Sequence, residues 1–163
     1  MHIRLATPDD APLLRDLILA LADYEKLRDE AEAGCSESDL RDHLQPDANP
    51  ALGALIAETD DGTAAGFALF FPVYSTFNTN WGLHLEDLFV RPEHRGQGIG
   101  LALMRAVAAE AVRRGCVRME WAVLDWNAPA IGFYERLGAR PLDDWTTMRL
   151  TGDALAALAS DGG

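Results

Sequence analysis

Apolar residues recur at helical spacing in two long segments of the chain, and both segments have the boundary residues of a helix. The first runs from Pro8 to about Glu25 and follows Thr7, whose hydroxyl suits the cap of a helix start. The second runs from Leu101 to Arg114 and ends before a glycine. Apolar positions three and four residues apart predict that each helix buries one face. Shorter helices are predicted at residues 36–44, 127–137 and 152–160.

Short apolar runs bounded by turn residues predict the strands of one sheet. Asp60-Asp61-Gly62 joins two of these runs as a hairpin, so the N-terminal half of the sheet is expected to be antiparallel. The helix at 101–114 lies between two further runs, and a right-handed crossover of this kind makes its flanking strands parallel. We therefore predict an α/β (α+β) fold in which helices flank a mixed sheet. The predicted strands are residues 2–6, 54–58, 64–74, 83–90, 117–123 and 145–150.

The strand before the second long helix loses its alternating pattern at one point. Leu83 and Leu85 point to one face of a regular strand. The next strongly apolar residues, Leu88 and Val90, fall out of phase with them. One extra residue at Glu86-Asp87, a β-bulge, explains the shift. A strand buried on both faces would also lack a single phase, and the pattern alone leaves that alternative open.

Composition predicts a single globular domain over residues 1–163. Of its residues, 48% are hydrophobic and 25% are charged, and a chain of this length can bury a core without metal or disulfide support. A formal net charge of −12 disfavours nucleic acid and anionic membranes as partners and suits a small cationic substrate, although acidity can also serve solubility alone. No membrane span or signal peptide is visible, which predicts a cytoplasmic protein. Cys35 and Cys116 lack the spacing of a metal or redox pair, so no metal is expected.

A glycine-rich turn follows the bulged strand and opens the second long helix. Gly96, Gly98 and Gly100 occupy alternate positions, where the missing Cβ atoms let a ligand approach the backbone closely. The amides at the start of the helix lack intrahelical partners and attract an anion, so strand, turn and helix form a diphosphate cradle. The absence of Lys-Ser or Lys-Thr after the last glycine excludes a nucleoside-triphosphatase loop, and the glycine spacing does not fit a dinucleotide fingerprint.

Two motifs resemble those of the GNAT superfamily of N-acetyltransferases. Arg95-Gly96-Gln97-Gly98-Ile99-Gly100 resembles the pyrophosphate-binding turn of that family. Trp126-Asn127-Ala128-Pro129, followed by Phe133-Tyr134, resembles its second signature. The similarity is strongest to the diamine branch, with its spermidine/spermine and thialysine acetyltransferases, and covers nearly the whole chain. It implies a GNAT-like sheet of six to seven strands, in which a bulge parts two parallel neighbours at the acetyl-CoA site.

The resemblance also implies which residues would bind acetyl-CoA, the co-substrate of the family. The strand from Leu88 to Val90 would bond the pantetheine arm through its backbone, and the glycine turn would bind the diphosphate. Tyr134 would be the general acid for the departing thiolate, and thiol and phenol pKa values, near about 8.5 and 10, suit this transfer. The residues implied for acetyl-CoA are Leu88, Phe89, Val90, Arg95, Gly96, Gln97, Gly98, Ile99, Gly100, Leu101, Asn127, Pro129 and Tyr134.

The acceptor amine must lose a proton before it attacks, because alkylamines have pKa values near about 10. Glu86 on the bulged strand is the predicted proton acceptor, with Asp87 beside it as a second candidate. Neighbouring strand residues face opposite sides, so both acids can reach one cleft only if the bulge turns one of them. The resemblance implies that Glu25 holds a distal ammonium. Met148 stands where polyamine-acetylating members carry a tryptophan, and Trp145 is the nearest substitute in a substrate site.

These observations predict an enzyme that moves the acetyl group of acetyl-CoA directly to a primary amine of a small cationic substrate, such as a polyamine, a diamine or a thialysine-like amino acid. A non-catalytic acyl-CoA sensor and a peptide or protein N-acetyltransferase are the alternatives. Glu86 and Tyr134 favour the enzyme, because a sensor needs neither an acid nor a base. The resemblance alone implies a homodimer, formed through the hairpin strands or the segment after Gly138.

Overall fold

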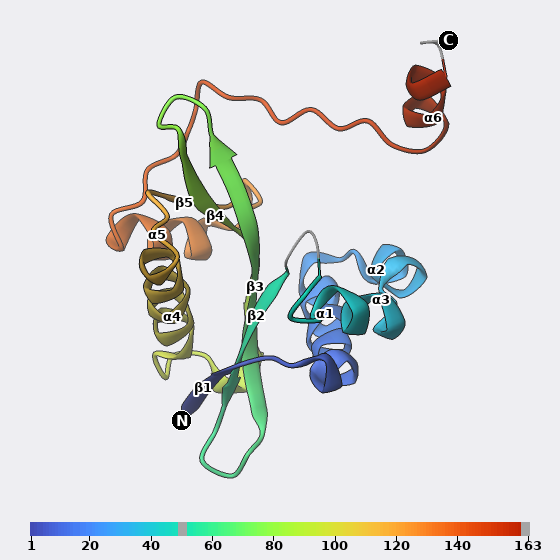
Figure 1. Ribbon diagram of the computed structural model, residues 1–163. Coiled ribbons are helices and arrows are strands. Elements are labelled where there is room, and N and C mark those ends of the chain that lie inside the picture. The colour runs from blue at the N-terminus through green and yellow to red at the C-terminus, as the bar shows by residue number, and fades with distance from the viewer. Residues whose placement is uncertain (49–51, 161–163) are drawn as a thin grey trace. The chain divides into compact units, whose positions relative to one another are not determined.

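The computed structural model describes residues 1–48 and 52–160 of the chain, which divides into two units (Figure 1). Met1–Ala122 forms the first unit and contains the whole sheet, and Val123–Gly163 forms the second. The single domain that composition predicts for residues 1–163 stays a prediction.

The sheet of the first unit has five strands, which follow one another in space in their order along the chain. The strands are β1 (His2–Leu5), β2 (Gly53–Glu58), β3 (Ala64–Ser75), β4 (Asn80–Val90) and β5 (Met119–Glu120). β1 to β4 pair in antiparallel fashion, and β5 joins β4 in parallel. The predicted mixed sheet with an antiparallel N-terminal half is therefore confirmed.

The predicted count of six to seven strands is wrong for the described residues, which form five. Residues 145–150 carry no strand, and the strand predicted at 117–123 is reduced to Met119–Glu120. An alternating pattern gives a segment the propensity for a strand, but only a neighbouring strand supplies the hydrogen bonds. The local sequence does not specify that neighbour.

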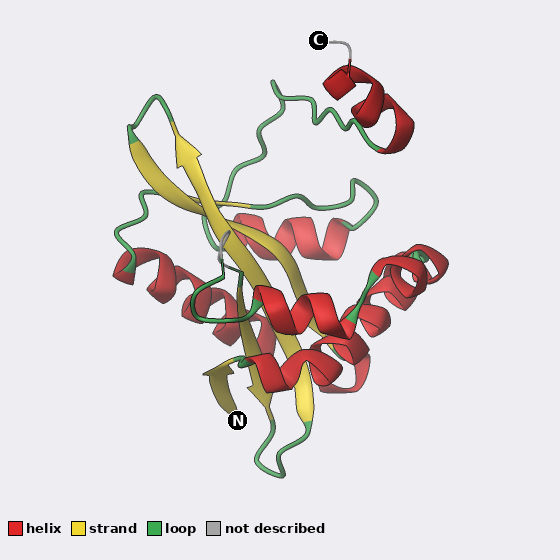
Figure 2. Ribbon diagram, turned by 45° about the vertical axis from the view of Figure 1, so that its right-hand side comes forward, coloured by secondary structure: helices red, strands yellow, loops and turns green. Residues whose placement is uncertain are grey.

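Helices cover both faces of the sheet in the first unit (Figure 2). α1 (Ala11–Glu25), α2 (Arg28–Gly34) and α3 (Glu37–His43) lie on one face, and α4 (Ile99–Arg113) lies on the other. The sequence pattern did not predict α2. The second unit contains α5 (Ala128–Arg136) and α6 (Gly152–Ser160). Within the described ranges, no helix combines the length and the apolar character needed to cross a membrane.

Two sets of apolar side chains hold the helices against the sheet. On one face, Leu17 of α1 packs in a buried cluster with Phe67 of β3 and Phe89 of β4. On the other face, Phe70 is fully buried, and the guanidinium of Arg114 after α4 lies 5.5 Å from its ring centre. Phe67 and Phe70 are three residues apart, so they point to opposite faces of β3.

β4 contains the predicted bulge, and Glu86 is its extra residue. Asp87 lies opposite Leu69 of β3. Leu85, two residues earlier in β4, lies opposite Phe70, which is only one residue further along β3. Two steps along β4 therefore match one step along β3, which is the geometry of a bulge.

The parallel pairing of β4 with β5 ends where the bulge begins. Its pairs join Leu83 to Met119 and His84 to Glu120. Beyond His84, none of the described residues pairs with β4 on this side. The edge of β4 that leads to Val90 therefore has no strand partner among the described residues on this side, and the parting of two parallel strands at an acetyl-CoA site stays a prediction.

Candidate active site

The turn between β4 and α4 has the backbone shape of an anion-binding cradle. Gly96 and Gly98 have φ values of 76° and 80°, in the left-handed region that other residues rarely adopt. A Cβ atom built on either glycine would meet no described atom within 4 Å, which leaves space for a ligand at this backbone. Gly98 caps α4, whose first-turn amides have no partners inside the helix and favour an anion. The turn therefore has the backbone shape and the free space that the predicted diphosphate would need.

Arg95 connects this turn to the preceding strand and to the end of α1. Its Nε donates a hydrogen bond of 2.9 Å to the carbonyl oxygen of Val90. Its guanidinium carbon lies 4.5 Å from the ring centre of Tyr24 and 5.8 Å from that of Phe89. Cation–π contacts of this kind contribute about 0.5–1 kcal/mol at exposed sites. The last turn of α1 and the cradle are therefore neighbours.

Replacing Gly98 by Ala is expected to weaken the binding of coenzyme A about tenfold. The new Cβ strains the left-handed conformation by roughly 1–2 kcal/mol, and relief of that strain shifts the amides of the cradle. Isothermal titration calorimetry measures the loss. Gly115→Ala is the matched control, since Gly115 after α4 has a φ of 72° and the same free space. Both variants should lose stability, and equal losses of affinity would contradict the role of Gly98.

An acidic hollow opens beside the last turn of α1. It combines carboxylates with an apolar wall, and one of the carboxylates comes from the bulged strand. No cation is among its described lining residues, so the hollow suits an ammonium group on an aliphatic chain. The hollow is lined by Ile18, Leu21, Ala22, Glu25, Leu27, Glu30, Ala31 and Asp87.

Asp87 can exchange a proton near neutral pH. Its burial, followed by the negative charges of Glu86 and Glu25, raises the pKa of its carboxyl group to about 7. Burial also raises the pKa of Glu25 above its usual range. A general base works best when its pKa lies near the operating pH, so Asp87 has the property that deprotonation of an amine requires.

The bulge allows neighbouring acids to share one face of the sheet. His84 lies opposite Phe71 of β3, and their ring centres are 5.0 Å apart. Glu86 stays on this face, because its carboxylate lies 3.4 Å from Nε2 of His84. Asp87 lies opposite Leu69, which points to the same face as Phe71 two residues away. Without the extra residue, Asp87 would point to the opposite face.

The structure brings Glu25 and Asp87 together in the acidic hollow but leaves Glu86 out of its lining. The side chain of Glu86 is 54% exposed and pairs with His84. The geometry thus favours Asp87 over Glu86 as the group that meets an amine. The order of the two candidates from sequence is the reverse, because only the register with β3 reveals that the bulge turns Asp87 to the face on which α1 lies.

Four predicted site residues belong to the second unit. Asn127 caps α5, since an amide of the first helical turn donates to its side-chain oxygen at 3.3 Å. Pro129 follows in that turn, and Tyr134 is half-buried with its ring centre 5.3 Å from that of Phe133. Trp145 is 75% exposed. Their approach to the cradle and to the acidic hollow stays a prediction from sequence.

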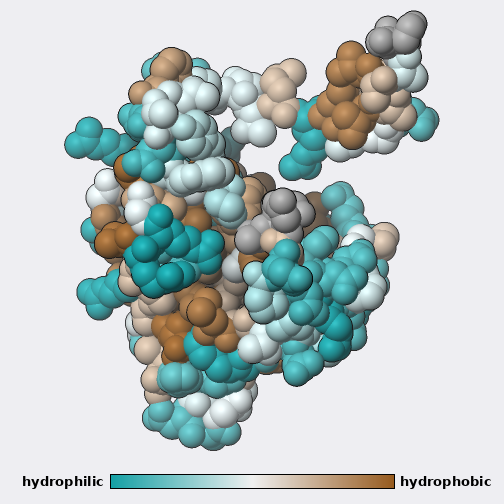
Figure 3. All heavy atoms as spheres, in the orientation of Figure 1, coloured by the Kyte–Doolittle hydropathy of each residue, from teal (hydrophilic) through white to brown (hydrophobic). Residues whose placement is uncertain are grey.

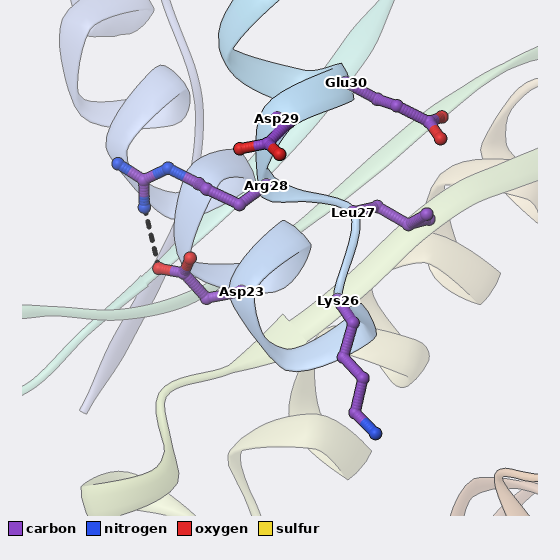
Figure 4. Close-up of a pocket in the computed structure, with 6 residues that line it drawn as sticks. All are labelled: Asp23, Lys26, Leu27, Arg28, Asp29 and Glu30. Carbon is purple, nitrogen blue, oxygen red and sulfur yellow. Dashed lines mark hydrogen bonds and ion pairs between the residues drawn. The ribbon is translucent and has the colours of Figure 1, made fainter.

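A second hollow lies at the junction of α1 and α2, and the sequence pattern did not reveal it. Arg28, the first residue of α2, forms ion pairs of 2.7 Å with Asp23 and 2.8 Å with Glu32. Acidic residues in the first turn of α2 are the signal that could have predicted this helix and its charged junction. The hollow is lined by Asp23, Lys26, Leu27, Arg28, Asp29 and Glu30 (Figure 4).

Known proteins resemble this chain over nearly its whole length. The model of the acetyltransferase (GNAT) family matches residues 21–139. An L-ornithine N5-acetyltransferase of Arabidopsis thaliana is 35% identical over 96% of this chain and 87% of the relative. A thialysine N-epsilon-acetyltransferase of Sus scrofa is 38% identical over 96% of each chain. Among solved structures, an integron cassette protein from the mobile metagenome of V. cholerae has a TM-score of 0.78 and 28% identity, covering 98% of this chain and 97% of that one.

Proposed function

This chain belongs to the acetyltransferase (GNAT) family and is an acetyl-CoA-dependent N-acetyltransferase, and we propose that its acceptor is a primary amine of a small cationic molecule. The acidic hollow is the observation that supports this acceptor most. Glu25 and Asp87 present negative charge there on an apolar wall without a described cation. The relatives named for ornithine and thialysine support the same class, because both molecules carry a side-chain amine.

Acetyl-CoA supplies the acetyl group, whose bond to sulfur is replaced by a bond to the amine nitrogen. The amides from Gly96 to Leu101 would hold its diphosphate, with Arg95 beside them. The open backbone edge from Leu88 to Val90 would bond the pantetheine arm. Asn127 and Pro129 of the second unit are proposed to complete this binding.

Two proton transfers accompany the reaction, and we assign them to different residues. Asp87 takes the proton that the protonated amine must lose, and Glu25 pairs with a further positive charge of the substrate. Glu86 is the second candidate for the first transfer. Tyr134 gives its phenolic proton to the departing thiolate, and exchange with solvent restores both Tyr134 and Asp87.

A panel of amines with acetyl-CoA tests the proposal. Thiol release is followed for diamines, polyamines, ornithine, lysine analogues and peptides, and coenzyme binding is measured by calorimetry. We expect release with small amines and none above background with peptides. Tight binding of the coenzyme without release from any amine would favour the sensor instead. Release with peptides alone would overturn the small-molecule acceptor.

A further inference from the structure

Arg95 lies over two aromatic rings, although it belongs to an exposed turn. Charged side chains at a protein surface normally extend into water, and hydrophilic residues gather over α2 and α3 in this way (Figure 3). The guanidinium carbon of Arg95 instead lies 4.5 Å from the ring centre of Tyr24 and 5.8 Å from that of Phe89. The two rings belong to α1 and β4, so Arg95 is held by a helix and a strand outside its own turn.

The two rings differ in how firmly they are fixed. Phe89 is 3% exposed and belongs to the buried cluster, with its ring centre 6.4 Å from that of Phe67. Tyr24 lies in the last turn of α1 and is 37% exposed. Replacing Phe89 would therefore open a cavity in the core, whereas replacing Tyr24 would change a ring at the surface.

Arg95 keeps most of its hydrogen-bond donors while it lies over the rings. A guanidinium has five N–H donors, and the bond of 2.9 Å from Nε to the carbonyl oxygen of Val90 uses one. A guanidinium that lies over a ring keeps its donors at the edge of its plane, where they can bind phosphate oxygens in pairs. The next residue, Gly96, has free space beside its backbone. Arg95 is therefore ordered beside the cradle before a ligand arrives.

We propose that Tyr24 is a positioning residue for the coenzyme, because its ring holds the guanidinium of Arg95 ready to bind the diphosphate. Fixing a long arginine side chain on binding costs conformational entropy. The ring of Tyr24 lowers this cost, since it orders Arg95 already in the free protein. A residue of α1, outside the glycine turn, thus raises the affinity for the coenzyme. This role rests on the proposed binding of the diphosphate between β4 and α4.

Calorimetry with coenzyme A tests the role of Tyr24. Tyr24→Leu removes the ring and keeps an apolar side chain, and we expect it to weaken binding about three- to fivefold. Tyr24→Phe keeps the ring without the hydroxyl and should bind coenzyme A as the unaltered chain does. Tyr74→Leu is the matched control, because Tyr74 is 48% exposed and also makes a ring contact, with Trp81. This control should leave the affinity unchanged.

A double-mutant cycle separates positioning from a general structural effect. Arg95→Met removes the guanidinium and keeps most of the aliphatic stem. In the Arg95→Met background the ring has no cation to hold, so adding Tyr24→Leu should change the affinity less than about 1.5-fold. If Tyr24 merely supported the end of α1, its loss would weaken binding equally in both backgrounds.

Several outcomes would overturn the proposal. Equal losses in the two backgrounds would do so, as would an unchanged affinity in Tyr24→Leu, or a Tyr24→Phe that binds as weakly as Tyr24→Leu. Should Tyr24→Leu melt far below the unaltered chain, Tyr24→Trp decides. Tryptophan is the best cation–π partner, so weaker binding by Tyr24→Trp would contradict the role. If the unaltered chain does not bind coenzyme A at all, the proposed cradle itself fails, and the role of Tyr24 fails with it.

Discussion

Replacing Asp87 by Asn is expected to lower kcat about 10²- to 10³-fold while coenzyme binding stays unchanged. Asn keeps the size of the side chain but cannot accept the proton of the amine, and a lost general base has an effect of this order. Because the pKa of Asp87 lies at about 7, kcat of the unaltered enzyme should rise with pH through this value. Steady-state rates from pH 5.5 to about 9 should show this rise, and the Asn variant should lack it.

Glu86→Gln is the comparison that separates the two acids. Glu86 is 54% exposed and lies outside the lining of the acidic hollow, so its loss is expected to lower kcat less than about tenfold. If kcat falls more in Glu86→Gln than in Asp87→Asn, the proton acceptor is Glu86, the first candidate from sequence.

The same Asp87→Asn substitution is expected to stabilise the fold at alkaline pH. Between pH 3.8 and about 7, the folded chain binds a proton at Asp87 that the unfolded chain does not. The free energy of unfolding therefore falls as the pH rises through this window and stays reduced above it. Asn cannot ionise, so we expect a gain of about 2 kcal/mol at pH 8 and little change at pH 4, measured by urea unfolding. A variant that is less stable at pH 8 would contradict the raised pKa.

Replacing Tyr134 by Phe is expected to lower kcat about 10²-fold or more without loss of coenzyme affinity. The ring remains beside Phe133, while the hydroxyl that would protonate the thiolate is gone. Stopped-flow thiol release and calorimetry measure the two quantities on the same preparation.

Tyr74→Phe controls for the general effect of removing a phenol. Tyr74 is 48% exposed on β3 and contacts Trp81 edge to face, with ring centres 5.1 Å apart. Tyr74→Phe should keep the kcat of the unaltered enzyme. Should Tyr134→Phe turn over as fast as Tyr74→Phe, the thiolate must receive its proton elsewhere.

Local signals in the sequence predicted where most elements begin and end. The left-handed φ of Gly98 marks the start of α4, which begins at Ile99 instead of the predicted Leu101. Asn127 marks the start of α5 through a hydrogen bond within its own first turn. Such signals depend on residues close in sequence, so the pattern contains them. The phase shift between Leu85 and Leu88 likewise predicted the bulge, because the extra residue keeps both leucines on one face of β4, opposite Phe70 and Ala68.

Features that depend on distant partners could not be predicted from the sequence pattern. The length of β5 depends on how far β4 pairs with it. A run of apolar residues does not specify that distance. The preference for Asp87 over Glu86 depends on Leu69, which lies in another strand. The second hollow could not be predicted either, because it forms only where α1 and α2 meet.

Because of the extra residue in β4, both the proposed base and the proposed coenzyme-binding backbone depend on the exact length of this strand. Before Glu86 the strand buries Leu85 on the α4 face, and after it the strand buries Phe89 on the α1 face. Deleting a single codon here would move every later side chain of β4 to the opposite face of the sheet, so the proposed base Asp87 and the proposed coenzyme-binding backbone from Leu88 to Val90 would be lost together. A point substitution can change one acid and leave the rest of the strand in place, whereas an insertion or deletion shifts every residue that follows it. We expect evolution to vary the side chains of this strand and to preserve its length.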